Sequence, residues 1–99
     1  MATITIKSPP IEMSLGLMSM NVKLEEATHL LPSYEVLGSF TSDLDGLSGA
    51  REAFDLTNNP SRQDERVERY GRYRSVSVGD IVEVNGVNYL CDHFGWVEL

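Results

Sequence analysis

The sequence predicts a small α+β protein in which one helix packs on a twisted antiparallel sheet with a C-terminal β-hairpin unit. Three observations predict this class. Two β-rich segments flank an Asn-Gly pair near the C-terminus, an alternating segment opens the chain, and one amphipathic stretch lies at about residues 48–58. Because 99 residues is the size of one domain, we expect a single domain over residues 1–99.

The strongest local signal is the hairpin formed by residues 81–84 and 87–91, which Asn85-Gly86 joins. Asn-Gly favours a type I′ turn because both central residues need positive φ, and a two-residue loop fixes the register. The register pairs residue 84 with 87 and residue 81 with 90. One face is predicted to be core and carries Val82, Val84, Val87, Tyr89 and Cys91. The other face carries Glu83 and Asn88, with Ile81 and Leu90 as a second apolar pair.

Two further turn signals flank the hairpin. Gly79-Asp80 precedes it and lets residues 75–78 lead into it. Residues 92–95 follow it, so that residues 96–99 return as a short last strand. Three or four strands within the last 26 residues indicate a tightly turned antiparallel sheet with the hairpin unit at its centre.

The first 41 residues are expected to add strands to this unit. Residues 2–7 alternate β-branched side chains and predict a strand, which two prolines end because proline cannot donate to a ladder. Residues 11–24 fit a strand with a bulge at Gly16, or a helix as the second choice, and residues 25–31 fit a helical turn. Residues 33–41 predict a strand whose inward side chains are Tyr34, Val36 and Phe40.

The best helix signal lies between residues 42 and 59. Asp43 and Asp45 supply carboxylates for the N–H groups at its start, and Pro60 follows its end. Two glycines weaken the first turn, so the firm part is placed at residues 48–58. The expected buried stripe has spacings of three and four and consists of Leu47, Ala50, Phe54 and either Thr57 or Leu56.

Composition and short motifs exclude several function classes. The formal charge of −7 argues against general affinity for nucleic acid or anionic membranes and favours attraction to basic surfaces. Cys91 is the single cysteine, so the chain forms no internal disulfide and no cysteine-based zinc site. His29 and His93 are far apart, and Cys91 is expected to be buried rather than to act as a nucleophile with His93. No nucleotide-binding or hydrolase motif is present, so we expect no catalytic, cofactor or metal site and no enzyme.

One string carries a resemblance to a known family. Residues 74–86 read R-S-V-S-V-G-D-I-V-E-V-N-G, with L-T-N-N upstream at residues 56–59 and a Gly-aromatic end. Over residues 34–99 the chain resembles the YodL-like domain. The resemblance implies a bacterial, phage or mobile-element setting, and no established chemistry. With no signal-peptide pattern and no long apolar run, we expect the protein in the cytosol of a bacterial host. Within the string, Asp80 is expected to shape its turn, and no role is assigned to Ser75 or Ser77.

Two sets of side chains are candidates for partner binding. Residues 62–74 hold five arginines against three acidic residues, a net +2 in an otherwise acidic chain. The arginines and tyrosines suit phosphate and stacking contacts with nucleic acid, or anchoring contacts with a protein. Alternatively, the arginines form salt bridges with neighbouring acidic residues. The candidates are Arg66, Arg69, Tyr70, Arg72 and Tyr73. The acidic set either imitates DNA phosphates or forms an ordinary acidic surface, and consists of Glu25, Glu26, Glu35, Asp43, Asp45, Glu52 and Asp55.

The leading expectation is a non-enzymatic phage or mobile-element accessory protein. It binds a host protein with a basic surface, such as a nucleic-acid enzyme or a defence component, and occludes it through the acidic set. One alternative is a nucleic-acid-binding module that uses residues 62–74. The other is a small structural or virion-associated subunit, which predicts a homo-oligomer. No membrane partner is expected.

Overall fold

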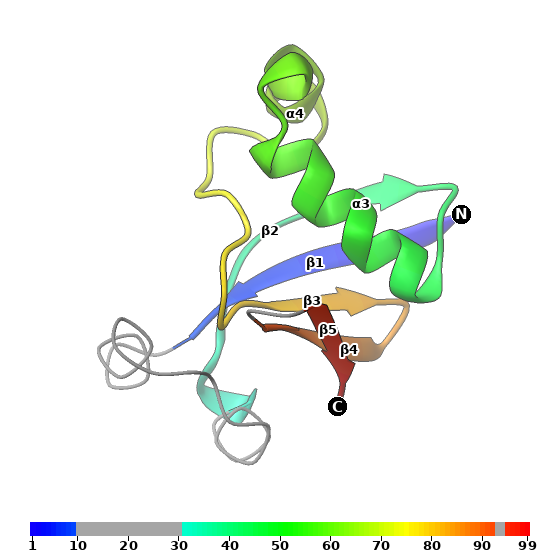
Figure 1. The fold of residues 1–99 in the computed structure, drawn as a ribbon, viewed down its shortest axis with the longest axis vertical. Helices are drawn as coiled ribbons and strands as arrows, with labels where there is room; N and C mark the ends of the chain where they lie inside the picture. Colours follow the sequence, from blue (N-terminus) through cyan, green and yellow to red (C-terminus); the bar gives the residue numbers. More distant parts are fainter. Residues whose placement is uncertain (10–30, 93–94) are drawn as a thin grey trace.

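A computed structural model describes residues 1–9, 31–92 and 95–99 of the chain. These residues form a five-stranded antiparallel sheet with the strand order β2-β1-β3-β4-β5 (Figure 1). The strands are β1 (Ala2–Ser8), β2 (Glu35–Ser42), β3 (Ile81–Val84), β4 (Val87–Asp92) and β5 (Gly95–Glu98). The helical elements are the 3₁₀ turns η1 (Leu31–Ser33) and η2 (Pro60–Arg62) and the helices α3 (Gly46–Asn58) and α4 (Gln63–Arg69).

Helix α3 crosses one face of the sheet, and α4 follows it at the end away from the hairpin (Figure 1). The predicted α+β class, with an antiparallel sheet and a packed helix over residues 48–58, is therefore confirmed. The strand predicted at residues 2–7 is confirmed as β1, and the one at residues 33–41 as β2. The predictions for residues 11–24 and most of residues 25–31 lie outside the described residues.

The hairpin has the predicted register. Val84 pairs with Val87 and Ile81 pairs with Leu90, and both turn residues have positive φ, 48° at Asn85 and 87° at Gly86. The hairpin also joins the rest of the sheet through its turn, because Asn85 Oδ1 accepts a hydrogen bond of 2.9 Å from the Thr3 amide. This contact lines β1 up beside β3, which is the central strand.

The two faces of the sheet carry separate apolar clusters. The cluster under α3 includes Val82, Val84, Tyr89 and Cys91 of β3 and β4, which were predicted to be core, together with residues of β1. The opposite face buries the predicted pair Ile81 and Leu90 together with Tyr34. The core position predicted for Val87 is wrong, because its side chain lies next to the turn and remains 38% exposed.

The buried face of α3 differs from the predicted stripe. The predicted positions Ala50, Leu56 and Thr57 are buried as expected, and Gly49 and Ala53 complete the buried face, but Leu47 and Phe54 are 39% and 42% exposed. The reason is close approach to the sheet: a Cβ added to Gly49 would lie 3.0 Å from Val84 Cγ1. A helix that turns its small residues to a sheet packs closer to it, and its larger side chains then face outward.

A β-bulge corrects the prediction for β2. Ile6 pairs with Gly38 and Lys7 pairs with Val36, so Leu37 is an extra residue on β2. The extra residue reverses the alternation of side chains along the strand. Leu37 therefore packs against the core under α3, whereas Val36, predicted to face inward, is 63% exposed.

Residues 75–78 lead into the hairpin as predicted and do not pair as a strand. The described part of the last 26 residues therefore contains three strands, the lower of the two expected numbers. The predicted turn is present, because the Asp80 amide donates to the Ser77 carbonyl at 3.0 Å. Residues 75 and 76 bond instead to the end of α3, which removes them from the sheet.

Candidate functional site

An ion-pair network joins α3 to α4. Arg62 donates from Nη1 to Glu52 Oε1 at 2.6 Å and to Asp55 Oδ2 at 2.7 Å, and from Nη2 to Glu65 Oε2 at 2.8 Å. Hydrogen bonds from Arg62 and then Arg69 lower the pKa of Glu65 to about 2. Hydrogen bonds to Glu65, Glu52 and Asp55 raise the pKa of Arg62 above its ordinary value. We call these five residues the ion-pair network.

Arg69 extends this network to the sheet. Its Nη1 lies 2.6 Å from Glu65 Oε2 and 3.5 Å from Glu52 Oε2, and its Nη2 donates to the Thr41 carbonyl at 2.9 Å. Its guanidinium also lies 5.1 Å from the centre of the Phe40 ring. Arg69 from the basic set and Glu52 and Asp55 from the acidic set are therefore brought together in one network within the chain.

The tyrosines of the basic segment are placed differently from each other. Tyr70 is 5% exposed, packs edge-on against Phe40 at 6.3 Å between ring centres, and donates its hydroxyl to the Arg74 carbonyl at 3.1 Å. Burial is the main cause that raises its pKa to about 12. Tyr73 packs edge-on against Tyr70 at 5.6 Å and is 53% exposed. Of the two predicted aromatic anchors, only Tyr73 is exposed to a partner.

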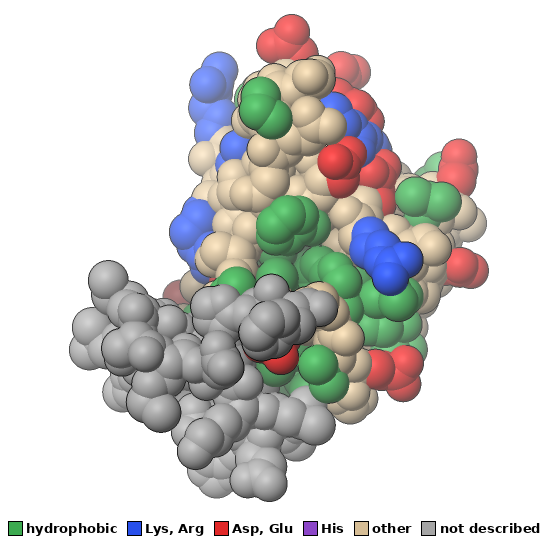
Figure 2. Space-filling view, viewed as in Figure 1, with side chains coloured by type: hydrophobic (Ala, Val, Ile, Leu, Met, Phe, Trp, Pro, Cys, Tyr) green, Lys and Arg blue, Asp and Glu red, His purple; other side chains and the backbone are tan. Residues whose placement is uncertain are grey.

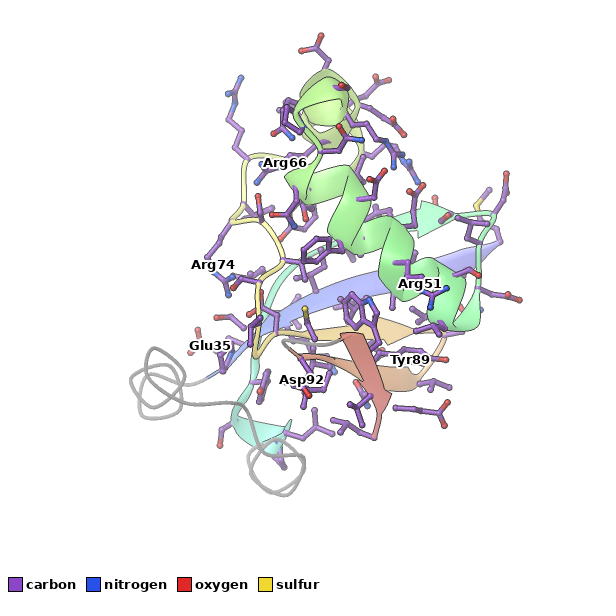
Figure 3. All side chains as sticks on the ribbon, viewed as in Figure 1. Glu35, Arg51, Arg66, Arg74, Tyr89 and Asp92 are labelled. Atoms are coloured by element: carbon purple, nitrogen blue, oxygen red, sulfur yellow. The ribbon has the colours of Figure 1, made fainter. Side chains whose placement is uncertain are left out.

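The acidic set is divided among distant places. Asp43 and Asp45 are exposed just before α3, whereas Glu35 begins β2 at the opposite side of the sheet from Arg51 (Figure 3). Glu35 and Ser42 are seven positions apart along β2, a distance of roughly 23 Å. Glu25 and Glu26 lie outside the described residues. The described members of the set therefore do not form one continuous acidic surface.

A buried ion pair organises the string that carries the resemblance. Arg74 binds Asp80 with both nitrogens, Nη2 to Oδ1 and Nη1 to Oδ2, each at 2.7 Å, and Asp80 is 1% exposed. Asp80 Oδ2 also accepts from the Ser77 amide at 2.8 Å. The hydrogen bonds to Asp80 raise the pKa of Arg74. Asp80 therefore shapes its turn as predicted, and Arg74 neutralises it.

The upstream string L-T-N-N binds the same segment. Ser75 Oγ donates to the Thr57 carbonyl at 2.7 Å, and the Val76 amide donates to Thr57 Oγ1 at 3.1 Å. Asn58 Nδ2 donates to the Val76 carbonyl at 2.9 Å. We call the contacts of residues 56–59 with residues 74–80 the motif joint. The residues that carry the resemblance therefore meet in space as a structural joint at the C-terminal end of α3.

The outer face of α3 carries exposed apolar side chains around one arginine. Leu47, Arg51 and Phe54 are spaced four and three residues apart, so they lie on one face of the helix. Figure 2 shows a single basic side chain among hydrophobic side chains over α3, and Figure 3 labels it as Arg51. We call these three residues the α3 patch. No ion pair of Arg51 is present among the described residues.

The sequence analysis did not predict the α3 patch because it assigned Leu47 and Phe54 to the core. One signal was available: the small residues Gly49, Ala50 and Ala53 share a face, which predicts close packing of that face on the sheet. The opposite face then holds Leu47 and Phe54.

Chemistry based on the cysteine is disfavoured by its surroundings. Cys91 is 4% exposed, and burial is the main cause that raises the pKa of its thiol to about 11. Within residues 1–9, 31–92 and 95–99, no group of three or more His, Cys, Asp or Glu side chains is placed to hold a metal ion. His29 and His93 lie outside these residues. In the same part of the chain, no helix has the length and apolar character needed to cross a membrane.

Comparison with known proteins gives no assignment: no family model, curated protein or solved structure matches the chain. The resemblance to the YodL-like domain therefore stays a prediction that rests on the residues of the motif joint.

Proposed function

We propose that this chain is a non-enzymatic protein-binding module that docks on its partner through the α3 patch. The observation that carries the proposal is the exposed side chain of Phe54, 42% accessible, on one helix face with Leu47 and with Arg51, which has no ion pair among the described residues. Aromatic residues and arginine are enriched among the residues that dominate binding energy at protein interfaces. The α3 patch has this composition.

The helix that carries the patch is held rigidly. Gly49 lies against Val84 of the sheet, the ion-pair network joins α3 to α4, and the motif joint fixes its C-terminal end. A side chain on a rigid element loses less conformational entropy on binding than one on a loose segment. The α3 patch is therefore prepared for docking without rearrangement of the helix.

The charges around the patch define the partner. Arg51 at the centre requires a carboxylate in an apolar surface, and Asp43 and Asp45 at the start of α3 favour basic residues at the edge of that surface. A second copy of the chain fits less well. An antiparallel pairing that sets Leu47 against Phe54 of the other copy would place Arg51 opposite Arg51, and like charges that face each other are unfavourable.

The proposed partner is a protein with basic residues, as the sequence led us to expect. The contact, however, is the α3 patch rather than the acidic set. The ion-pair network already uses Glu52 and Asp55, so the acidic contribution comes from Asp43 and Asp45. The resemblance to the YodL-like domain supports a host protein in the bacterial cytosol as the partner. Covering a functional surface of that protein is then the mode of action.

The test compares capture of proteins from bacterial lysate, with and without nuclease treatment, by tagged variants. We expect a stoichiometric protein that the unmodified chain retains and that Phe54→Ser and Arg51→Glu lose. Val67→Ser is the matched control because Val67 is 40% exposed on α4, outside the patch, and this variant should retain the protein. Thermal unfolding should be nearly unchanged in all variants because each replaced side chain is exposed.

Equal capture by all variants would contradict docking through the α3 patch, even if a partner is found. Loss of capture with Val67→Ser alone would place the contact on α4 instead. Capture that disappears after nuclease treatment would favour the alternative of a nucleic-acid-binding module.

A further inference from the structure

An open hollow lies beside α4, away from the α3 patch. Its volume is about 470 Å³, and it is lined by Gln63, Asp64, Arg66, Val67 and Arg72. Two of the five lining residues are arginines, which come from α4 and from the segment that follows it. The hollow is therefore a place where two positive charges from separate elements meet.

Arg66 is the half-buried member of this pair, and its hydrogen-bond partners are all neutral. It donates to Gln63 Oε1 at 3.0 Å, to the Thr57 carbonyl at 3.3 Å, and to the Tyr73 carbonyl (Figure 3). Its Nε is buried and has no hydrogen-bond partner in the part of the chain that the structure describes. No carboxylate hydrogen-bonds to this partly buried guanidinium in the same part of the chain, so its charge would attract an anion in the hollow.

The other basic residues of the segment are different. Arg62, Arg69 and Arg74 each have a carboxylate oxygen within 2.8 Å. Arg72 is exposed and makes no ion pair or hydrogen bond with the described residues, so its donors are available to a ligand. Of the five arginines at residues 62–74, two therefore keep an unbalanced charge, and both line the hollow.

We propose that the hollow between Arg66 and Arg72 binds a small oxyanion of the phosphate type. Arg72 can offer its planar donors in pairs to phosphate oxygens, and Arg66 contributes its charge and the remaining hydrogen of Nη2. A nucleic-acid strand is a weaker fit, since two free arginines neutralise only about two phosphates and give little affinity at physiological salt. Asp64 also lines the hollow and lowers the affinity by repulsion, so we expect binding in the millimolar range.

The test is titration of the ¹⁵N-labelled chain with inorganic phosphate, read from the Nε–Hε signals of the arginines. Sodium chloride at the same ionic strength serves as the reference titration. We expect a saturable shift of the Arg66 signal with phosphate that chloride does not produce. Arg72→Ala should weaken the binding at least about tenfold, because it removes a charged donor. Asp64→Asn should strengthen it several-fold because it removes the repelling carboxylate.

The matched control is Arg51→Ala, which removes the other exposed unpaired arginine and should leave the Arg66 shift unchanged. An equal loss in Arg51→Ala and Arg72→Ala would overturn the proposal, because it would indicate general charge screening. No shift with phosphate would overturn it as well. A short single-stranded oligonucleotide forms the last arm: a shift with the oligonucleotide alone would replace the small-anion site by a nucleic-acid contact.

Discussion

Arg62 and Arg74 lie in the same short segment, and both bind carboxylates, but the carboxylates differ in how exposed they are. Arg74 binds one carboxylate with both nitrogens, and that carboxylate, Asp80, is 1% exposed. Arg62 binds three carboxylates, of which the side chains of Glu65 and Asp55 are 42% and 54% exposed. Their hydrogen bonds have similar lengths, 2.7 Å at Arg74 and 2.6–2.8 Å for the closest contact to each carboxylate at Arg62.

The burial of the carboxylate determines how much each arginine contributes to the stability of the fold. Arg74 covers the buried carboxylate of Asp80, so its loss would leave that carboxylate without a counter-charge and with the Ser77 amide as a remaining donor. Water and salt ions can replace Arg62 at Glu65 and Asp55, so the network contributes less to stability for each contact. We therefore expect the Arg74–Asp80 pair, whose carboxylate is buried although Arg74 is 43% exposed, to contribute more to stability than any single contact of the ion-pair network, which joins α4 to α3.

The largest expected effect is that of Arg74→Ala. The variant removes the counter-charge of the buried Asp80 carboxylate and leaves the Ser77 amide as a donor to it, so the free energy of unfolding should fall by up to about 3–5 kcal/mol. Urea denaturation at neutral pH measures it. Arg72→Ala is the control, since Arg72 has no partner among the described residues and its loss should be close to zero. A loss below about 1 kcal/mol for Arg74→Ala would show that the buried pair is no stronger than an exposed one.

The second effect concerns the motif joint. Thr57→Val keeps the shape of a side chain that is 1% exposed but removes the hydroxyl that accepts from the Val76 amide at 3.1 Å. Because the amide is then buried without a partner, we expect a loss of about 1–3 kcal/mol in the free energy of unfolding. Thr41→Val, at an exposed position of β2, is the matched control. If the two variants are equally stable, the hydroxyl of Thr57 does not stabilise the motif joint.

The third effect is sensitivity to salt. Arg62→Met keeps most of the apolar stem and removes the charge from the ion-pair network, so we expect a loss clearly smaller than that of Arg74→Ala. In about 1 M sodium chloride, where screening acts over about 3 Å, the difference from the unmodified chain should shrink. Denaturation at low and high salt measures both variants. An Arg62→Met difference that salt does not change would indicate that the network is effectively buried.

The smallest effect depends on pH. The hydrogen bonds from Arg62 and Arg69 hold the pKa of Glu65 at about 2, below its value in an unfolded chain. A lowered folded-state pKa gives stability that is present above the unfolded pKa and lost as the pH falls towards the folded value. The difference in unfolding free energy between the unmodified chain and Glu65→Gln should therefore disappear between about pH 5 and pH 2.

The control for the pH experiment is Glu68→Gln, because Glu68 is exposed on α4 and forms no ion pair with the described residues. This variant should not differ from the unmodified chain in its pH dependence. A Glu65→Gln difference that persists at low pH would mean that the side chain contributes through packing rather than through its charge.

Sequence reasoning predicted the local features well. Asn85-Gly86 determines the hairpin register because its turn type follows from two residues, and alternating side chains determine β1. The turn at Asp80 is also local, since its carboxylate binds the Ser77 amide three residues away. These features were predictable because each depends on neighbours within a few positions of the chain.

The faces of the elements were less predictable. The positions of Leu47 and Phe54 depend on which side of α3 meets the sheet, and the close contact of Gly49 with Val84 decides this. The position of Val36 depends on a bulge opposite β1, and nothing within β2 shows where the register shifts. Each of these outcomes is set by an element distant in the sequence.

The sequence by itself therefore determined the hairpin, the strands, the presence of the central helix and the excess of negative charge. Tertiary structure alone decided that Arg74 meets Asp80 in the interior, that Arg62 collects three carboxylates, and that Arg66 and Arg72 keep their charges. The physical reason is that the partners of an arginine depend on how helices and strands are packed. The α3 patch and the hollow beside α4 are the surfaces that these contacts within the chain leave open to a partner or ligand.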